Sequence, residues 1–210
     1  YNTELNASKT AEKYTIVASI FFTRFKNALV VDKFKWNNAS AILYQGIMSD
    51  VYAMQNKAIA NVYGFNINGS TNLTPNTIVA ATYSYTKGRY INKDVNGVNA
   101  EKPLDHIPPV YGQVSMRWNG KLWFAELQTL FNDRKDARDY SNSGEDNADK
   151  NPVIGNPAWQ IYNLRAGYSH KSGLSVQLAF ENLLDLRYRY FASGVTAGGR
   201  SVGCTLSYKF

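Results

Sequence analysis

The sequence predicts an all-β fold, an antiparallel up-and-down transmembrane β-barrel segment of about eight strands. Apolar and polar side chains alternate with a period of two in segments of about ten to thirteen residues, the length that crosses a hydrocarbon layer. Long polar connections alternate strictly with tight turns, which places all the long connections at one end. Aromatic residues gather beside the tight turns, as at a membrane interface.

The last two predicted strands show the clearest alternation. Residues 173–183 place Leu, Val, Leu and Phe on one side and Ser, Gln, Ala and Glu on the other. Residues 199–210 place Val202, Cys204, Leu206, Tyr208 and Phe210 on one side. Because a helix requires a period near 3.6 residues, both segments are predicted to be strands.

Six further segments complete the predicted sheet. They are residues 14–23, 54–68, 76–86, 110–118, 123–129 and 159–170. Residues 1–13 are polar and predict the foot of a preceding strand followed by a short turn.

Tight turns are predicted at residues 69–75, 119–120 and 171–173, of which Asn119-Gly120 is the strongest hairpin signal. The long connections are residues 26–50, 87–106, 132–156 and 185–198. The aromatic side chains expected beside the tight turns are Tyr14, Trp118, Trp123, Tyr168, Tyr208 and Phe210.

Composition excludes several classes of protein. No stretch of about 18 apolar residues is present, which excludes a transmembrane helix. The formal charge is +7, but the 23 Lys and Arg residues are scattered, so no nucleic-acid partner is expected. The single Cys204 excludes an internal disulfide and a cysteine zinc site. The sequence opens without a signal peptide, so we expect a removed signal or the back part of a longer polypeptide.

The alternation assigns a set of polar side chains to the barrel interior. They are Gln113, Arg117, Glu126, Gln128, Arg165 and Glu181. Two interpretations are open for them: a hydrogen-bonded, charge-paired interior wall, and the lining of a substrate path.

A second set lies in the long connections and has the charges and rings to bind an anionic chelate, although solvated surface is the alternative. It comprises Tyr90, Arg134, Lys135, Arg138, Tyr140 and Lys150. His106 and His170 are interpreted as ordinary polar residues, because neither has a Ser and an Asp at its own level of the interior. The sequence therefore predicts no enzyme, no metal site and no cofactor.

Short motifs along the chain resemble those of TonB-dependent outer-membrane receptors. NLRAGY at residues 163–168, ENLLD at 181–185 with Tyr188, and LSYKF at 206–210 carry the resemblance, which is strongest from residue 161 onward. VYGF at 62–65, YSYTKG at 83–88 and IPP at 107–109 stand where that family has similar signatures.

The resemblance implies that residues 1–210 are the last eight strands of a 22-stranded barrel, with the plug domain and the energy-coupling box outside this chain. It implies energy-coupled uptake of a scarce ligand, most simply an iron–siderophore complex, across a Gram-negative outer membrane. The implied partners are outer-membrane lipid and lipopolysaccharide, the TonB complex acting through the plug, the barrel-assembly machinery and a ferric-siderophore-type ligand.

The resemblance also makes the terminal alternating series a signal for assembly into the membrane. Its residues are Val202, Leu206, Tyr208 and Phe210. The open alternative is a self-contained eight-stranded outer-membrane barrel with a structural or adhesive role, in which side chains fill the interior.

Overall fold

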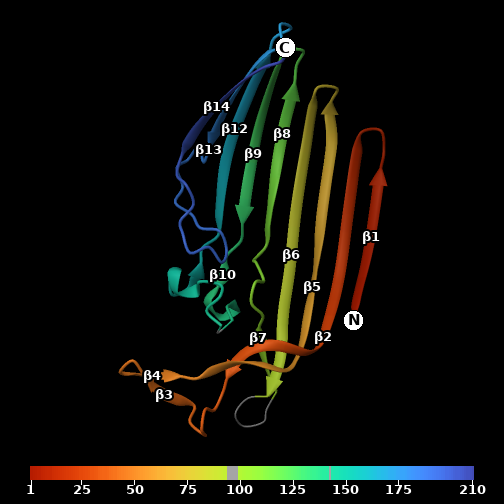
Figure 1. Cartoon of the computed structure of the whole chain (residues 1–210). Helices are drawn as coiled ribbons and strands as arrows, with labels where there is room; N and C mark the ends of the chain where they lie inside the picture. Colours follow the sequence, from red (N-terminus) through yellow and green to blue (C-terminus); the bar gives the residue numbers. More distant parts are fainter. Residues whose placement is uncertain (94–98, 142) are drawn as a thin grey trace.

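The computed structural model describes residues 1–93, 99–141 and 143–210, and these form one large antiparallel sheet (Figure 1). In the described residues, nine strands follow one another across the sheet in sequence order, and a further short strand pairs with one of them. The nine are β1 (Asn2–Thr10), β2 (Tyr14–Lys33), β5 (Tyr52–Thr74), β6 (Thr77–Lys93), β8 (Tyr111–Asn119), β9 (Trp123–Asn132), β12 (Trp159–Ser169), β13 (Leu174–Glu181) and β14 (Ser201–Tyr208).

The up-and-down order confirms the predicted fold class. Every neighbouring pair of strands in the path is antiparallel, and β1 corresponds to the predicted foot of a preceding strand. In Figure 1 the tight turns lie at the top and the long connections at the bottom. The sheet stays open, because β1 and β14 are edge strands that do not pair with each other.

Three strands are longer than predicted. β2, β5 and β6 have 20, 23 and 17 residues. The predicted turn at 69–75 is wrong, because β5 continues to Thr74 and the chain reverses at Pro75 and Asn76. Gly69 pairs with both Ile16 and Ala81, so the neighbouring strands hold these polar residues in the hydrogen-bonded ladder.

The predicted irregular connection 26–50 is also largely strand. β2 runs through it to Lys33, past a register shift at residues 25–28 where Asn27 has a φ of 56°. β3 (Ala41–Tyr44) and β4 (Ile47–Asp50) then form a hairpin closed by Gln45 and Gly46, whose φ values are 49° and 82°. Figure 1 shows this hairpin reaching sideways from the loop end of the sheet.

The other long connections carry short elements of their own. β7 (Asn99–Pro103) pairs with the end of β6, while residues 94–98 of the predicted loop lie outside the described residues. Within 132–156, β10 (Lys135–Asp136) pairs with β11 (Gly155–Asn156), and two short 3-10 turns, η1 (Ala137–Asp139) and η2 (Ala148–Lys150), lie between them.

The two faces of the sheet differ in chemistry, as the alternation predicts. On the apolar face, Met116 lies opposite Val79 and Leu127, and Met116 and Leu127 are 48% and 42% exposed. On the polar face, Arg117 lies opposite Glu126. Only six apolar side chains among the described residues are buried: Val30, Ala60, Tyr90, Tyr140, Trp159 and Ile161. An exposed apolar face of this extent indicates contact with lipid or another apolar surface.

Within the described ranges, no helix is long and apolar enough to cross a membrane.

Hydrogen exchange should separate the sheet from its longest connection. In detergent or lipid, we expect slow exchange for the amides of β5, β6, β8 and β9, which have partners on both sides. Residues 143–152 make only short-range backbone hydrogen bonds and should exchange rapidly. Protection of 143–152 as strong as that of β6 would contradict this.

Candidate functional site

Four of the predicted interior side chains form a row of ion pairs across β8, β9, β12 and β13. Arg117 Nη1 lies 3.2 Å from Glu126 Oε2, and Arg165 Nη1 lies 3.2 Å from Glu126 Oε1. The two guanidinium groups therefore share one carboxylate. Arg165 Nη2 also lies 3.6 Å from Glu181 Oε1, which extends the row to β13.

A second row on the same face is uncharged and lies closer to the loop end. The Gln128 side-chain amide donates to Gln113 Oε1 at 3.0 Å, and Asn163 Nδ2 donates to Gln128 Oε1 at 3.2 Å. The Asn182 backbone N–H donates to Asn163 Oδ1 at 2.9 Å. Together the two rows bring all six predicted interior residues into contact with one another or with immediate neighbours.

An aromatic ring supports the charged row. The Arg117 guanidinium lies 3.9 Å from the centre of the Phe124 ring, a cation–π contact. The same ring covers Gly167 on the facing strand, where a Cβ atom would overlap it. These contacts favour the charge-paired wall of the two interpretations. The assignment of this face to a barrel interior remains a prediction.

At the loop end of the polar face lies an apolar pocket of about 320 Å³. The Trp159 ring centre is 4.5 Å from that of Tyr188 and 5.1 Å from that of Tyr190, and the indole N–H donates to the Arg189 carbonyl at 2.9 Å. The segment after β13 is thereby held against β12. The described lining includes the aromatic residues Tyr111, Trp159, Tyr190 and Phe191, while Phe131 borders the pocket from β9 with its ring packed against Tyr83 on the apolar face.

Asn182 organises the connection after β13. It is 2% exposed with a φ of 50°, a left-handed conformation that Asn tolerates better than most residues. Its side-chain amide donates to the Leu186 and Gly198 carbonyls, and its Oδ1 accepts the Leu186 N–H at 2.9 Å. Asp185 Oδ1 accepts the Arg200 N–H at 2.7 Å. The ENLLD motif thus ends β13 and shapes the loop.

Two of the five principal loop candidates for ligand binding are exposed. Arg134 Nε lies 2.6 Å from Asp136 Oδ1, and Arg138 lies 3.6 Å from the same carboxylate. Lys150, also considered at this end, is paired with the adjacent Asp149 at 2.7 Å.

Lys135 and Tyr140, by contrast, do not face solvent. Lys135 Nζ donates to the Ile107 carbonyl at 2.5 Å and lies 5.0 Å from the centre of the Phe191 ring and 5.8 Å from that of Tyr140. Burial lowers the pKa of the Lys135 ammonium, against the opposing effect of Asp139. Burial also raises the pKa of the Tyr140 hydroxyl. Both residues hold the loop together.

Tyr90 is buried as well, at 3% exposed. It packs with Val30 and Ala60 in the small core at the loop end, with Leu104 at its margin. Its ring is therefore not presented to a ligand in this conformation.

The two histidines form local contacts. His106 Nε2 lies 2.9 Å from Glu145 Oε2, and its backbone N–H donates to both oxygens of the buried Asp146. His170 is hydrogen-bonded to Ser172 within a tight turn. Among the described residues, no group of three or more His, Cys, Asp and Glu side chains is placed to hold a metal ion.

The terminal alternating series lies on the edge strand β14 and just beyond it. Val202, Leu206, Tyr208 and Phe210 are exposed, and the last two rings make an edge-to-face contact at 5.2 Å. Val202 and Leu206 lie opposite Phe180 and Val176, which continues the apolar face to the edge.

Sequence reasoning missed several residues that the structure places in these sites. Asn163 lies in the row of Gln128, where the alternation of β12 could have found it. The ring cluster of Trp159 with Tyr188 and Tyr190 had no such signal, because its segments are far apart in the sequence. Lys87 and Arg89 line a pocket of about 510 Å³ between β6 and residues 133–139.

An apolar exposed face, a networked polar face and long connections confined to one end define the wall of a transmembrane β-barrel. The family model described as "TonB dependent receptor-like, beta-barrel" matches residues 2–183, and the chain belongs to this family. The predicted resemblance is thereby confirmed. Members of this family are receptors and transporters of the Gram-negative outer membrane, not enzymes. No curated protein sequence matches the chain.

Solved structures show the same fold at low sequence identity. "Copper transporter OprC" aligns with a TM-score of 0.74 at 16% identity, over 100% of this chain and 30% of that chain. The ferric citrate transporter FecA aligns with 0.68 at 16%, over 100% and 31%. The siderophore receptor PiuA from Acinetobacter baumannii aligns with 0.65 at 16%, over 100% and 28%. The chain therefore spans less than a third of each of these structures.

Removing the shared carboxylate should destabilise the sheet. Glu126→Gln leaves two guanidinium groups without their common partner, and we expect a loss of about 1–3 kcal/mol in the free energy of unfolding. Urea unfolding in lipid vesicles, followed by tryptophan fluorescence, measures this.

The matched control is Glu181→Gln in the same row. Glu181 is 54% exposed and 3.6 Å from its single partner, so the loss should stay below about 1 kcal/mol. Equal losses for the two variants would contradict the special role of Glu126.

Proposed function

We propose that the chain is the C-terminal part of an outer-membrane receptor that takes up a scarce ligand by TonB-dependent energy coupling. The single observation that carries the proposal is the family match over residues 2–183. The wall geometry supports it, because a networked polar face suits a barrel interior and an apolar face suits lipid. On this proposal, the plug and its contact with the TonB complex belong to parts of the receptor outside this chain.

We place ligand capture at the end of the sheet that carries the long connections, facing the outside of the cell. The aromatic pocket on the polar face supports this placement, since it joins several loops to the wall and presents apolar rings beside polar groups. Its lining residues come from β8, β9, β12 and the connection after β13, so one bound molecule would touch four segments.

The ligand we propose is an iron–siderophore complex. FecA and PiuA, which share the fold, are described as a ferric citrate transporter and a siderophore receptor. OprC is described as a copper transporter, so the fold alone does not decide the cargo. Haem, cobalamin and carbohydrate ligands are the competing cargoes.

Deletion of the receptor should abolish uptake of one iron chelate. We expect cells without the receptor and its paralogues to lose uptake of radiolabelled iron on one member of a panel of citrate, hydroxamate and catecholate chelates. Unchanged iron uptake for all three would show that the substrate assignment is wrong, although the barrel would stand. Haem, cobalamin and oligosaccharide uptake in the same cells tests the competing cargoes.

A pocket variant links that uptake to this chain. Tyr190→Ala removes a ring from the polar-face pocket and should weaken uptake by up to about ten-fold. Tyr162→Ala is the control, because Tyr162 lies opposite Thr129 on the apolar face. Equal uptake in the two variants would argue against the pocket as the capture site.

The terminal alternating series is proposed as a signal to the barrel-assembly machinery. Phe210 is exposed and lies beyond the paired residues of β14, so Phe210→Ala removes no cross-strand pair. A large loss of membrane-inserted receptor would therefore reflect lost recognition by the assembly machinery rather than lost stability of the sheet. Phe180→Ala is matched in chemistry but sits inside β13, where lost burial costs about 1–3 kcal/mol.

Quantitative immunoblots of outer-membrane fractions compare the two variants in the full receptor. We expect the membrane level of Phe210→Ala to fall well below that of Phe180→Ala. Equal levels would leave the terminus without a special role.

A further inference from the structure

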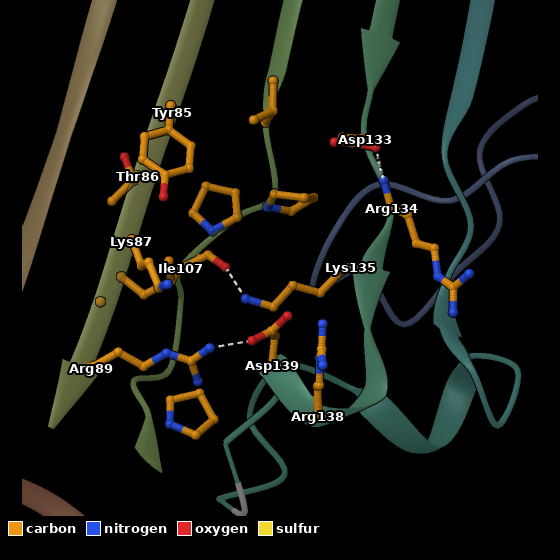
Figure 2. A pocket seen from close by; sticks show the side chains of 15 residues that line it. Tyr85, Thr86, Lys87, Arg89, Ile107, Asp133, Arg134, Lys135, Arg138 and Asp139 are labelled. Carbon is orange, nitrogen blue, oxygen red and sulfur yellow. Dashed lines mark hydrogen bonds and ion pairs between the residues drawn. The ribbon is translucent and has the colours of Figure 1, made fainter. Parts of the chain in front are cut away.

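We propose that a basic pocket on the apolar face, between β6 and residues 133–139, binds a phosphate group of a lipid headgroup in the outer leaflet, as carried by lipopolysaccharide. The pocket has a volume of about 510 Å³ and lies where β8 has left the side of β6 (Figure 2). Among the described lining residues it shares only Pro108 with the polar-face pocket assigned to cargo, and the proposal does not depend on which cargo is carried.

The strand register assigns the pocket to the apolar face. Val79 lies opposite Met116, and both belong to that face. The same row of β6 continues through Tyr85, Lys87 and Arg89, because β6 pairs with β5 without a register shift over these residues. Lys87 and Arg89 therefore follow directly after the last aromatic residues of the apolar face.

An aromatic cluster marks the loop-side limit of the apolar band. The Phe65 ring stacks on Tyr83 with 5.8 Å between centroids and lies 5.6 Å from Tyr85. Tyr83 in turn lies 6.3 Å from Phe131. This cluster spans β5, β6 and β9, as an interfacial girdle does.

The height of the band fits a membrane. Trp118, beside the tight turns, lies opposite Thr77. The strand from Thr77 to Tyr85 is roughly 26 Å long. The apolar band between the aromatic girdles of outer-membrane barrels is about 25 Å tall, and strand tilt reduces the height that these residues span. Lys87 stands roughly 7 Å of strand beyond Tyr85, and the headgroup layer is about 5–8 Å deep on each side. Lys87 is thus level with headgroup phosphates.

The pocket carries more positive than negative charge. Arg89 is engaged in a close ion pair with Asp139, and Figure 2 shows the two side chains meeting across the pocket. Lys87 has no ion-pair partner among the described residues, and Arg138 is 84% exposed with Asp136 3.6 Å away. The charged side chains in the described lining are Lys87, Arg89, Arg134, Lys135 and Arg138 against Asp133 and Asp139. Asp136, beside the lining, pairs with Arg134 and Arg138, which leaves five cationic side chains against three carboxylates. A doubly charged phosphate complements this excess through charge-assisted hydrogen bonds.

The pocket is closed toward the polar face, which argues against cargo as its occupant. Gly88 points to that face, and a Cβ atom added there would lie 2.6 Å from Ile107 Cδ1. Ile107 and Pro108 thus form the back of the pocket. Ile107 covers the polar side at Gly88, so the neighbouring Lys87 is open to an anion from the opposite, lipid-facing side.

Lipid binding to the purified full receptor tests the proposal. The probes are lipopolysaccharide, its dephosphorylated derivative and inorganic phosphate, and native mass spectrometry in a detergent titration gives the affinities. We expect Lys87→Gln to weaken lipopolysaccharide binding about ten-fold, the effect of one charge-assisted hydrogen bond. Dephosphorylated lipid should bind the unmodified receptor as weakly as lipopolysaccharide binds the variant.

The control is the double variant Lys121→Gln with Lys171→Gln, which removes two exposed lysines at the tight-turn end and should leave binding unchanged. Lys87→Gln with Arg89→Gln should weaken binding further; if it does not insert, the single variant decides. Inorganic phosphate that binds as tightly as lipopolysaccharide would overturn the proposal in favour of a free-anion site. Unchanged lipid binding in Lys87→Gln would also overturn it, and a simultaneous loss of iron-chelate uptake would identify a cargo site instead.

Discussion

The pairing of backbone N–H and C=O groups between neighbouring strands is the constraint on which the rest of this structure depends. Hydrocarbon offers no alternative partners, so a spanning segment must satisfy every backbone group within the protein. The antiparallel ladder from β1 to β14 does this along the paired lengths of its inner strands, apart from the register shifts near Asn27 and Thr74. Because successive side chains then point to opposite sides, one chain produces a lipid-compatible face and a polar face without a conventional core.

The same ladder explains the ion-pair row. Arg117, Glu126 and Arg165 are directly opposite one another on three successive strands, so the register alone brings their charged groups together. Slipping any strand by one residue would send its charged side chain to the lipid face and an apolar one to the polar face. The ion-pair row therefore favours this strand register and also pairs the charges on the polar face.

Alternation predicted the fold class and the chemistry of the two faces, because a period of two is a local property of each strand; that the polar face lines a barrel interior stays a prediction. The prediction from alternation failed where the local composition indicates a turn or loop but the neighbouring strands pair with the segment. Residues 69–74 read as a polar turn, yet both neighbours hold them as strand, and β2 continues beyond an irregularity at Asn27. Burial of Lys135 and Tyr90 was equally hidden, because their covering residues, such as Phe191 and Val30, are distant in sequence. Tertiary contacts of this kind leave no mark on a short window of residues.

The Asn182 residue connects the loop after β13 to the polar face of the sheet. One side chain holds Leu186 and Gly198 at opposite ends of a loop, while its own N–H is tied to Asn163 in the middle of β12. Asn163 is in turn bonded to Gln128, and Gln128 to Gln113. A displacement of the loop must either break several of these hydrogen bonds at once or move the amide side chains that connect β12, β9 and β8. The loop after β13 is thereby connected to β12, β9 and β8 by a continuous series of hydrogen bonds.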